Sequence, residues 1–213
     1  VWTFKLRKGV KFSNGNDFNA DDVLFSYKRI SDPDAQMKTN VASVKEVLKV
    51  DDHTVQFVTH APNPILTGRL NSVFIMDKEW SEKTGSTTVT VMDQDKISPA
   101  GQTAMGTGAF MITERTAQVK TVLVPNPNWW GKSTHNLTKV IMTPVKQDST
   151  RVAALLSGEL DMAYPVPTQD IKRVNSNSGT SVLVGPELRT IFMFMDQNSD
   201  KLFGTETKNP FKD

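Results

Sequence analysis

The chain has 213 residues, of which 38% are hydrophobic and 23% are charged, and its formal net charge is +2. A chain of this length can bury a core without help from disulfides or metals, and its composition is that of an ordinary globular protein. The 25 basic and 23 acidic residues are spread along the whole chain, which argues against a nucleic-acid-binding surface. The absence of cysteine excludes disulfides, zinc–thiolate sites and cysteine nucleophiles. No run approaches the ~20 apolar residues of a membrane span.

The first part of the chain predicts three short strand-like stretches and two helices. Apolar and polar side chains alternate over residues 2–6, as in a half-buried strand, and residues 10–12 resume the alternation after a turn. Asn19 can then cap a helix that has acidic residues in its first turn and an apolar stripe along one face. Residues 54–58 predict a further strand, and residues 65–70 predict a short helix after a proline-rich stretch.

The second part predicts a regular alternation of strands and helices. Residues 81–104 are rich in Ser, Thr and Gly, and we expect loops with one short helix there. Asp148 can cap a helix that ends at Gly158, and another helix begins near Thr168. We expect strands at residues 110–112, 121–124, 140–142, 160–164, 181–184 and 190–195. This alternation favours a mixed α/β fold.

Several segments, in one order and with consistent spacing, carry a resemblance to a known family. They are residues 2–12, 14–15, 19–23 with Tyr27, 106–110, 126–131, 151–161 and 209–213. Together they resemble the family 5 extracellular solute-binding proteins, which serve peptide, nickel and related ABC importers. The first of these segments looks like the signature hairpin of the family. The match covers nearly the whole chain, so it is far more specific than any single motif.

The resemblance implies a periplasmic-binding-protein-like clamp, in which two lobes close on a ligand. Residues 1–106 would form a peripheral subdomain of the first lobe, and residues 107–213 would form its central part, ending at the crossover to the second lobe. We expect the chain to be an excerpt, because it opens within a strand-like run and stops after residues 209–213 without a closing element. The second lobe normally supplies charged groups that hold the ligand, so the excerpt alone is expected to bind weakly or not at all.

Tyr164 is the first candidate for contact with a ligand. It follows residues 160–163 at the end of an expected strand, where the family places aromatic or polar contacts. In that role its ring would pack against the ligand and its phenol would donate a hydrogen bond. The alternative is a tyrosine in the core of the lobe.

The expected strand at residues 190–195 is the second candidate, because an exposed strand edge could receive a peptide backbone by strand pairing. Phe192 and Phe194 share one face of this strand, and the residues between and beside them share the other. One set should face the core and the other the cleft, and core packing is the alternative for each residue. Arg189 could bind a carboxylate through two hydrogen bonds, the alternative being a solvated arginine.

Other conspicuous residues favour structural roles. Trp129 and Trp130 could form a platform on which sugars or bases stack. Their position after an expected strand favours a structural role instead, in which the two rings cover the turn. Asp93 and Asp95 supply only two carboxylates, whereas calcium needs about six to eight oxygen ligands, so we expect them to lie in a solvated loop. The three histidines lack the spacing of a metal pair. Because no dinucleotide loop, phosphate-binding loop or serine-hydrolase elbow occurs, we expect binding without catalysis and without a cofactor.

The function implied by the resemblance is the solute-binding component of an ABC importer. We expect a monomer in the periplasm or at the cell surface, secreted or lipid-anchored, that captures a peptide or similar small solute by lobe closure and delivers it to a membrane permease. Nickel chelates, haem, opines and oligosaccharides stay open as cargo. One alternative is the ligand-sensing domain of a cytoplasmic transcriptional regulator, which an upstream helix-turn-helix would identify. The other is a hydrolase, which a turnover assay would identify.

Overall fold

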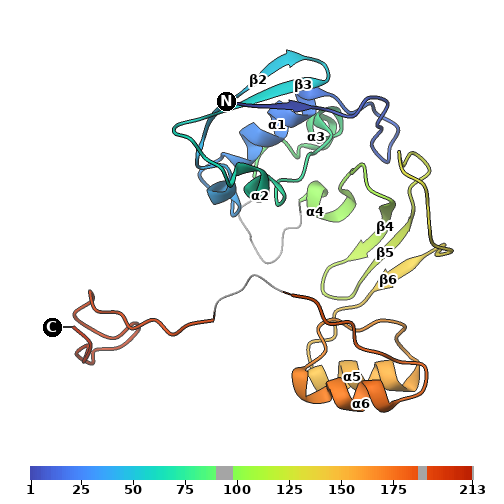
Figure 1. The fold of residues 1–213 in the computed structure, drawn as a ribbon, viewed down its shortest axis with the longest axis vertical. Helices are drawn as coiled ribbons and strands as arrows, with labels where there is room; N and C mark the ends of the chain where they lie inside the picture. The colour runs from blue at the N-terminus through green and yellow to red at the C-terminus, as the bar shows by residue number, and fades with distance from the viewer. Residues whose placement is uncertain (90–97, 187–190, 213) are drawn as a thin grey trace. The chain divides into compact units, whose positions relative to one another are not determined.

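The computed structural model describes residues 1–89, 98–186 and 191–212. Strands and helices combine in a mixed α/β arrangement, which confirms the expected fold class (Figure 1). The chain forms two compact units, residues 1–144 and residues 145–213. None of the helices in the described residues has the length and the apolar composition that crossing a membrane requires. The expected subdomain boundary at residue 106 concerns the lobes of a longer protein and stays a prediction.

The first unit begins with an antiparallel sheet of three strands in the order β1-β3-β2. The strands are β1 (Trp2–Lys5), β2 (Val44–Asp51) and β3 (Thr54–Thr59). The strands expected at residues 2–6 and 54–58 are confirmed. Sequence patterning misses β2, because Val44 is the only fully buried residue of this strand and no clean alternation results.

The hairpin expected between residues 2–6 and 10–12 is wrong. β1 pairs with β3 instead, with Phe4 opposite Val55, and Lys11 forms an isolated bridge elsewhere. Residues 10–12 alternate because Val10 and Phe12 are buried, not because they belong to a sheet with β1. Burial alone can therefore produce the pattern that predicts a strand.

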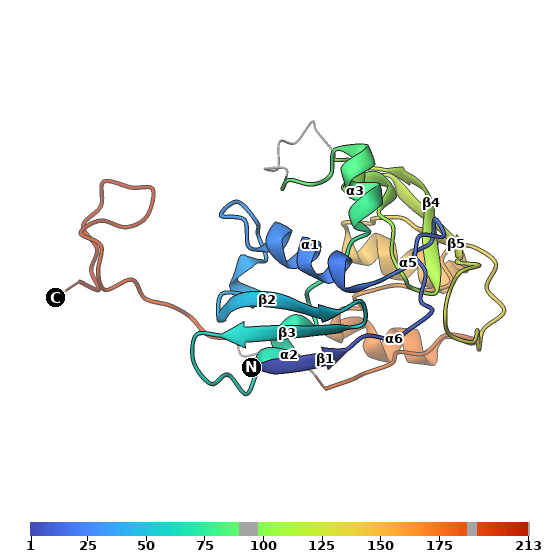
Figure 2. The same cartoon turned by 90° about the horizontal axis from the view of Figure 1, so that it is seen from above.

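Helix α1 (Ala20–Ile30) packs on one face of this sheet (Figure 2). Asn19 caps it as expected, since its side chain accepts a hydrogen bond from the Asp21 N–H at 2.7 Å. The Asp22 carboxylate accepts in return from the Asn19 N–H at 2.9 Å, which completes a capping box. The buried cluster between helix, sheet and neighbouring segments consists of Ala20, Val23, Val41, Val44, Val55, Phe57 and Leu66.

Four short helices lie in the described part of the first unit, one before β2 and three between the two sheets in chain order. They are η1 (Lys38–Asn40), α2 (Leu66–Leu70), α3 (Lys78–Thr84) and α4 (Pro99–Thr103). The helix expected at residues 65–70 is confirmed. Asp77 is buried and caps α3 by accepting from the Trp80 N–H at 3.0 Å. Its other oxygen accepts from the side-chain amides of Asn14 and Asn16, which fastens their turn to this helix.

The second sheet of the first unit has the order β4-β5-β6, again antiparallel. Its strands are β4 (Phe110–Thr116), β5 (Lys120–Pro125) and β6 (Val140–Met142), which confirms the three strands expected here. The Ser13 N–H donates to the Gly106 carbonyl at 2.9 Å, and the Asn128 side chain donates to the Ser13 carbonyl at 3.2 Å. The N-terminal segment is thereby joined to the region of the second sheet.

The second unit contains α5 (Asp148–Ser157), η2 (Thr168–Asp170) and α6 (Ile171–Ser176). Both expected helices are confirmed, and Gly158 ends α5 in the left-handed conformation with φ +80°. The expected cap is wrong by one position: Gln147 is the N-cap, and Asp148 is the first helical residue, where its carboxylate binds a side chain of the next turn.

The strands expected at residues 160–164 and 181–184 are not formed. A strand exists only where a neighbouring backbone completes its hydrogen bonds, and no strand in the described residues pairs with either segment. The side chains of Met162 and Leu183 are 80% and 96% exposed. Apolar side chains are expected to be buried, but these two are not buried by any described part of the chain.

Candidate ligand-binding site

Tyr164 lies in an irregular segment between α5 and η2. The chain turns back after α5, where the Leu160 N–H donates to the Ala154 carbonyl at 3.1 Å. The side chain of Tyr164 is 83% exposed, and in the described residues no ring contact or hydrogen bond engages it. Its ring therefore packs in no core among the described residues of the second unit.

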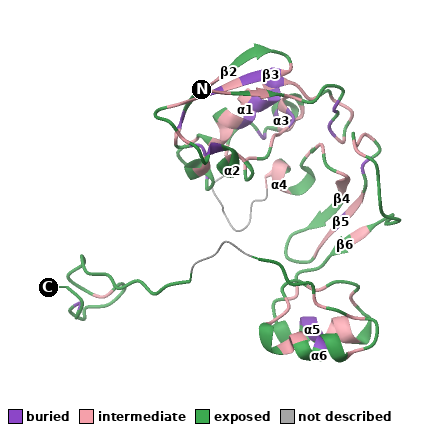
Figure 3. Cartoon of the chain, viewed as in Figure 1, coloured by how far each residue is buried: buried purple, intermediate pink, exposed green. Residues whose placement is uncertain are grey.

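Residues 191–195 form no strand, so the expected strand is wrong for the part that the structure describes. No other strand in the described residues lies beside them to complete a ladder. Both faces are exposed, including Phe192, Phe194 and Met193, so neither set of side chains packs in a core (Figure 3). Arg189 lies outside the described residues.

The structure brings together only part of the expected site. The rings of Phe192 and Phe194 meet edge to face, with centroids 4.5 Å apart and an interplanar angle of 72°. No ring contact in the described residues joins either of them to Tyr164. Of the three aromatic candidates, the structure therefore joins only Phe192 and Phe194.

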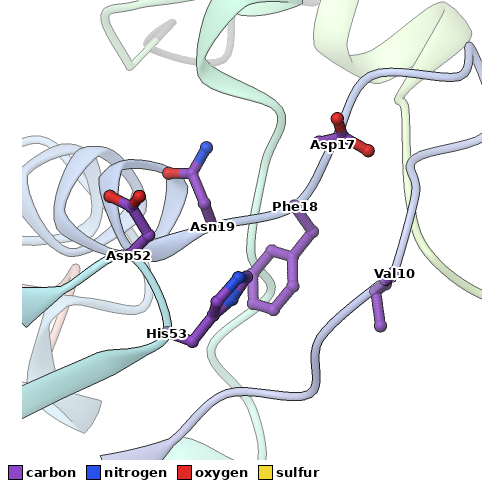
Figure 4. A pocket seen from close by; sticks show the side chains of 7 residues that line it. Val10, Asp17, Phe18, Asn19, Asp52 and His53 are labelled. Carbon is purple, nitrogen blue, oxygen red and sulfur yellow. The ribbon is translucent and has the colours of Figure 1, made fainter.

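A cavity of about 400 Å³ lies in the first unit, where sequence reasoning places no site (Figure 4). Its lining residues are Gly9, Val10, Asp17, Phe18, Asn19, Asp52 and His53. The N–H groups of Leu6 and Ala20, on either side of residues 9–19, donate to the carbonyls of His53 and Asp52 at 2.8 and 2.9 Å, which holds this stretch near the β2–β3 turn. No sequence motif links two such distant stretches, so only the strand pairing reveals the cavity.

The carboxylates at this cavity already pair with lysines. Asp17 binds Lys11 at 2.5 Å, and Asp52 binds Lys49 at 2.9 Å. The hydrogen bond from Lys49 lowers the pKa of Asp52 below its usual value. His53 places its Nδ1 atom out of contact with water and without a hydrogen-bond partner in the described residues. A cationic ligand would have to displace both lysines, which makes the cavity a poor site by charge.

The tryptophan pair has the contacts of a structural turn. The rings of Trp129 and Trp130 lie 6.2 Å apart and are tilted by 57°. The Arg7 guanidinium lies 4.2 Å from the centroid of the Trp130 ring, a cation–π contact with the N-terminal segment. Gly131 lies so close to Trp129 that a Cβ atom there would be 2.5 Å from Cζ2. These contacts fit the structural role that the sequence favours.

In the part of the chain that the structure describes, no group of three or more histidine, aspartate or glutamate side chains could hold a metal ion. Asp93 and Asp95 lie outside that part.

Comparison with known proteins places these features in a family. The family model of bacterial extracellular solute-binding proteins, family 5 Middle, matches residues 1–213. The chain is 24% identical over 212 residues to the periplasmic murein peptide-binding protein MppA of Escherichia coli (strain K12), covering 90% of this chain and 38% of that protein. It is 26% identical over 215 residues to the periplasmic oligopeptide-binding protein OppA of Salmonella typhimurium, again covering 90% of this chain and 38% of that protein.

A solved structure shows the same fold. NikZ from Campylobacter jejuni, in complex with Ni(L-His), aligns with a TM-score of 0.70 and 21% identity, over 83% of this chain and 34% of that chain. The chain therefore spans well under half the length of the proteins it matches, and its fold is that of a partial lobe of a periplasmic binding protein. Because the family model matches every residue, the chain belongs to the family 5 bacterial extracellular solute-binding proteins.

Proposed function

We propose that this chain forms part of the solute-binding component of an ABC importer, which captures a peptide or similar small solute outside the cytoplasm and delivers it to a membrane permease. The observation that carries the proposal is the family match over residues 1–213. Two relatives that are named for binding a murein peptide and oligopeptides favour peptides as the cargo. Both relatives are much longer than this chain, so the rest of the gene product would supply the opposing lobe.

In this proposal, residues 1–106 form the peripheral subdomain and residues 107–213 form the central part of the first lobe. Tyr164, Phe192 and Phe194 would contact the ligand. Their large exposure supports this role, because an aromatic ring that a ligand covers gains burial and an oriented contact. Arg189, beside the two phenylalanines in sequence, is proposed to bind a carboxylate of the ligand. Ligand binding would favour a closed state that the permease recognises, and this step needs no catalysis and no cofactor.

A thermal-shift screen of the full gene product tests the proposal. The probes are trialanine, glutathione, nickel–histidine, haem and maltotriose, each added well above the protein concentration. A ligand that binds only the native state raises the melting temperature by mass action, about 2.7 kcal/mol of stabilisation at 100 times its Kd. A shift with the two peptides alone supports the proposal. A shift with another probe reassigns the cargo, and the absence of any shift contradicts capture of these solute classes.

A further inference from the structure

Arg151, near the start of α5, donates four side-chain hydrogen bonds. It is only 8% exposed. Its Nε and Nη2 atoms donate to the Pro165 carbonyl at 3.0 and 2.9 Å, and Nη1 donates to the Val145 carbonyl at 2.7 Å. Nη2 also donates to the Asp148 carboxylate at 2.5 Å. One guanidinium thus joins three points that lie up to 20 residues apart.

The chemistry of the guanidinium explains why these positions are held firmly. A buried cation is costly unless it is paired and hydrogen-bonded, and here Asp148 supplies the opposite charge. The planar guanidinium donates in fixed directions, unlike the rotating ammonium of lysine. The carbonyls of Val145 and Pro165 are therefore constrained in direction as well as in distance.

The segment that carries Tyr164, residues 161–166, has few hydrogen bonds to the rest of the chain. In the described residues, the bonds from Arg151 to the Pro165 carbonyl are the only hydrogen bonds to residues 161–166. The flanking contacts involve the backbone at Leu160 and Pro167, outside the segment. Within the segment, the side chains of Ala163 and Val166 are half-buried and the other four residues are exposed.

We propose that Arg151 is a positioning residue: by holding the Pro165 carbonyl, it fixes the preceding residue, Tyr164, relative to α5. That Tyr164 contacts a ligand rests on the proposed function, whereas its positioning by Arg151 does not. The Arg151 side chain itself is buried, so it would act through Tyr164 and not by touching the solute.

Spin-label mobility in the full gene product, without ligand, tests this inference. A nitroxide is attached to Met162→Cys, within the segment, or to Lys172→Cys, an exposed position in α6 that serves as the control site. Each label is compared between the parent and Arg151→Lys, which keeps the charge but loses the fixed directions of the guanidinium. Arg173→Lys, an exchange at an arginine whose side chain is 62% exposed, is the matched control variant.

The expected result is a selective change at Met162. In Arg151→Lys the mobile component of that label should rise roughly fivefold, which corresponds to the loss of one net hydrogen bond. The label at Lys172 should not change, and Arg173→Lys should change neither label. An unchanged Met162 label would overturn the proposal. Equal rises at both sites would also overturn it, because Arg151 would then stabilise the whole unit and not this segment. Since no solute is used, failure here and failure of the ligand screen are distinguishable.

Discussion

The two units of the chain bury their apolar side chains to very different extents. In the first unit, α1 and the first sheet enclose a cluster in which Phe57 is 6% exposed. In the second unit, the only buried apolar residues among those described are Val152 and Val174. Phe194 and Leu183 of that unit are 86% and 96% exposed. Since apolar burial is the main driving force of folding, the first unit carries its own core, while the second offers apolar surface for contact.

The largest expected effect is in the core of the first unit. Phe57→Ala removes a ring that meets Phe4 and Tyr27 edge to face, at centroid distances of 5.3 and 6.2 Å. We expect the free energy of unfolding to fall by about 3–5 kcal/mol. Urea unfolding followed by tryptophan fluorescence measures it, because all four tryptophans lie in the first unit. Phe74→Ala, at a ring that is 82% exposed, is the control, and equal losses for both variants would contradict a core at Phe57.

A smaller loss of stability is expected at Gly131, where the packing leaves no room for an added methyl group. At Gly131 a Cβ atom would lie 2.5 Å from the Trp129 ring, so the ring must shift. Gly131→Ala should cost about 1–3 kcal/mol of stability. Gly106→Ala meets no atom within 4 Å and should be nearly neutral in the same urea titration. If Gly131→Ala is as neutral as its control, the tryptophan turn is not packed as the structure shows.

The chain has two tyrosines, Tyr27 in the first unit and Tyr164 in the second, and they allow the packed unit and the exposed unit to be compared for ligand binding. Tyr164→Ala in the full gene product should weaken solute binding roughly tenfold and leave the melting temperature nearly unchanged. Tyr27→Phe removes the hydrogen bond from its hydroxyl to the Val44 carbonyl at 3.1 Å, so it should lower the melting temperature and leave affinity unchanged. Isothermal titration calorimetry and thermal melting measure the two quantities. A lower melting temperature with unaltered affinity for Tyr164→Ala would place this residue in a core.

The pKa values of two carboxylates, one in each unit, should be shifted in opposite directions from the usual value. Burial raises the pKa of Asp22 above the usual 3.8, and the hydroxyl of Ser199 lowers the pKa of Asp196 below it. The contribution of Asp22 to stability is therefore present at acid pH and lost as the pH rises through its raised pKa. That of Asp196 is present above 3.8 and lost as the pH falls through its lowered pKa.

Carbon-13 NMR of the side-chain carboxyls measures both titrations. Ser199→Ala should return the pKa of Asp196 toward its usual value without moving that of Asp22, because the two residues share no perturbing group. A midpoint for Asp22 below 3.8 would show that its hydrogen bonds from Asn19 and Lys78 outweigh burial.

Local patterns predict the features of this chain that depend on local contacts. The capping of α1 by Asn19 and the end of α5 at Gly158 follow from the backbone groups of a single helix terminus, so a few residues of sequence suffice. The strand at residues 121–124 is confirmed, and its partners β4 and β6 lie close to it along the chain. For such elements, the interactions that decide the structure lie within the same stretch of sequence.

Features that depend on distant partners are not predictable in the same way. Residues 191–195 have the composition of a strand, but a strand also needs a neighbour, and none pairs with them in the described residues. The cavity in the first unit joins residues 9–19 to the β2–β3 turn, and no motif spans that separation. Arg151 stands in a recognisable family segment, yet its bonds to the carbonyls of Val145 and Pro165 appear only in three dimensions. Sequence shows that Tyr164 is available as an aromatic residue, and only the structure brings Arg151 to the carbonyl of the residue that follows it.

The smallest expected change in stability, that of Phe194→Ala, gives the sharpest contrast with the core variant Phe57→Ala of the first unit. Phe194→Ala repeats the exchange of Phe57 at a ring that is 86% exposed, so in the 213-residue chain its effect on stability should be below about 0.5 kcal/mol. The second unit has no tryptophan, so hydrogen exchange of the α5 amides is the measurement. A loss above about 1 kcal/mol would show that the ring packs within its own unit. The same variant in the full gene product decides its role: a cost of about 3–5 kcal/mol there would mean that the rest of the protein covers the ring. An equally small cost in both would leave Phe194 accessible to a solute, as the proposed binding site requires.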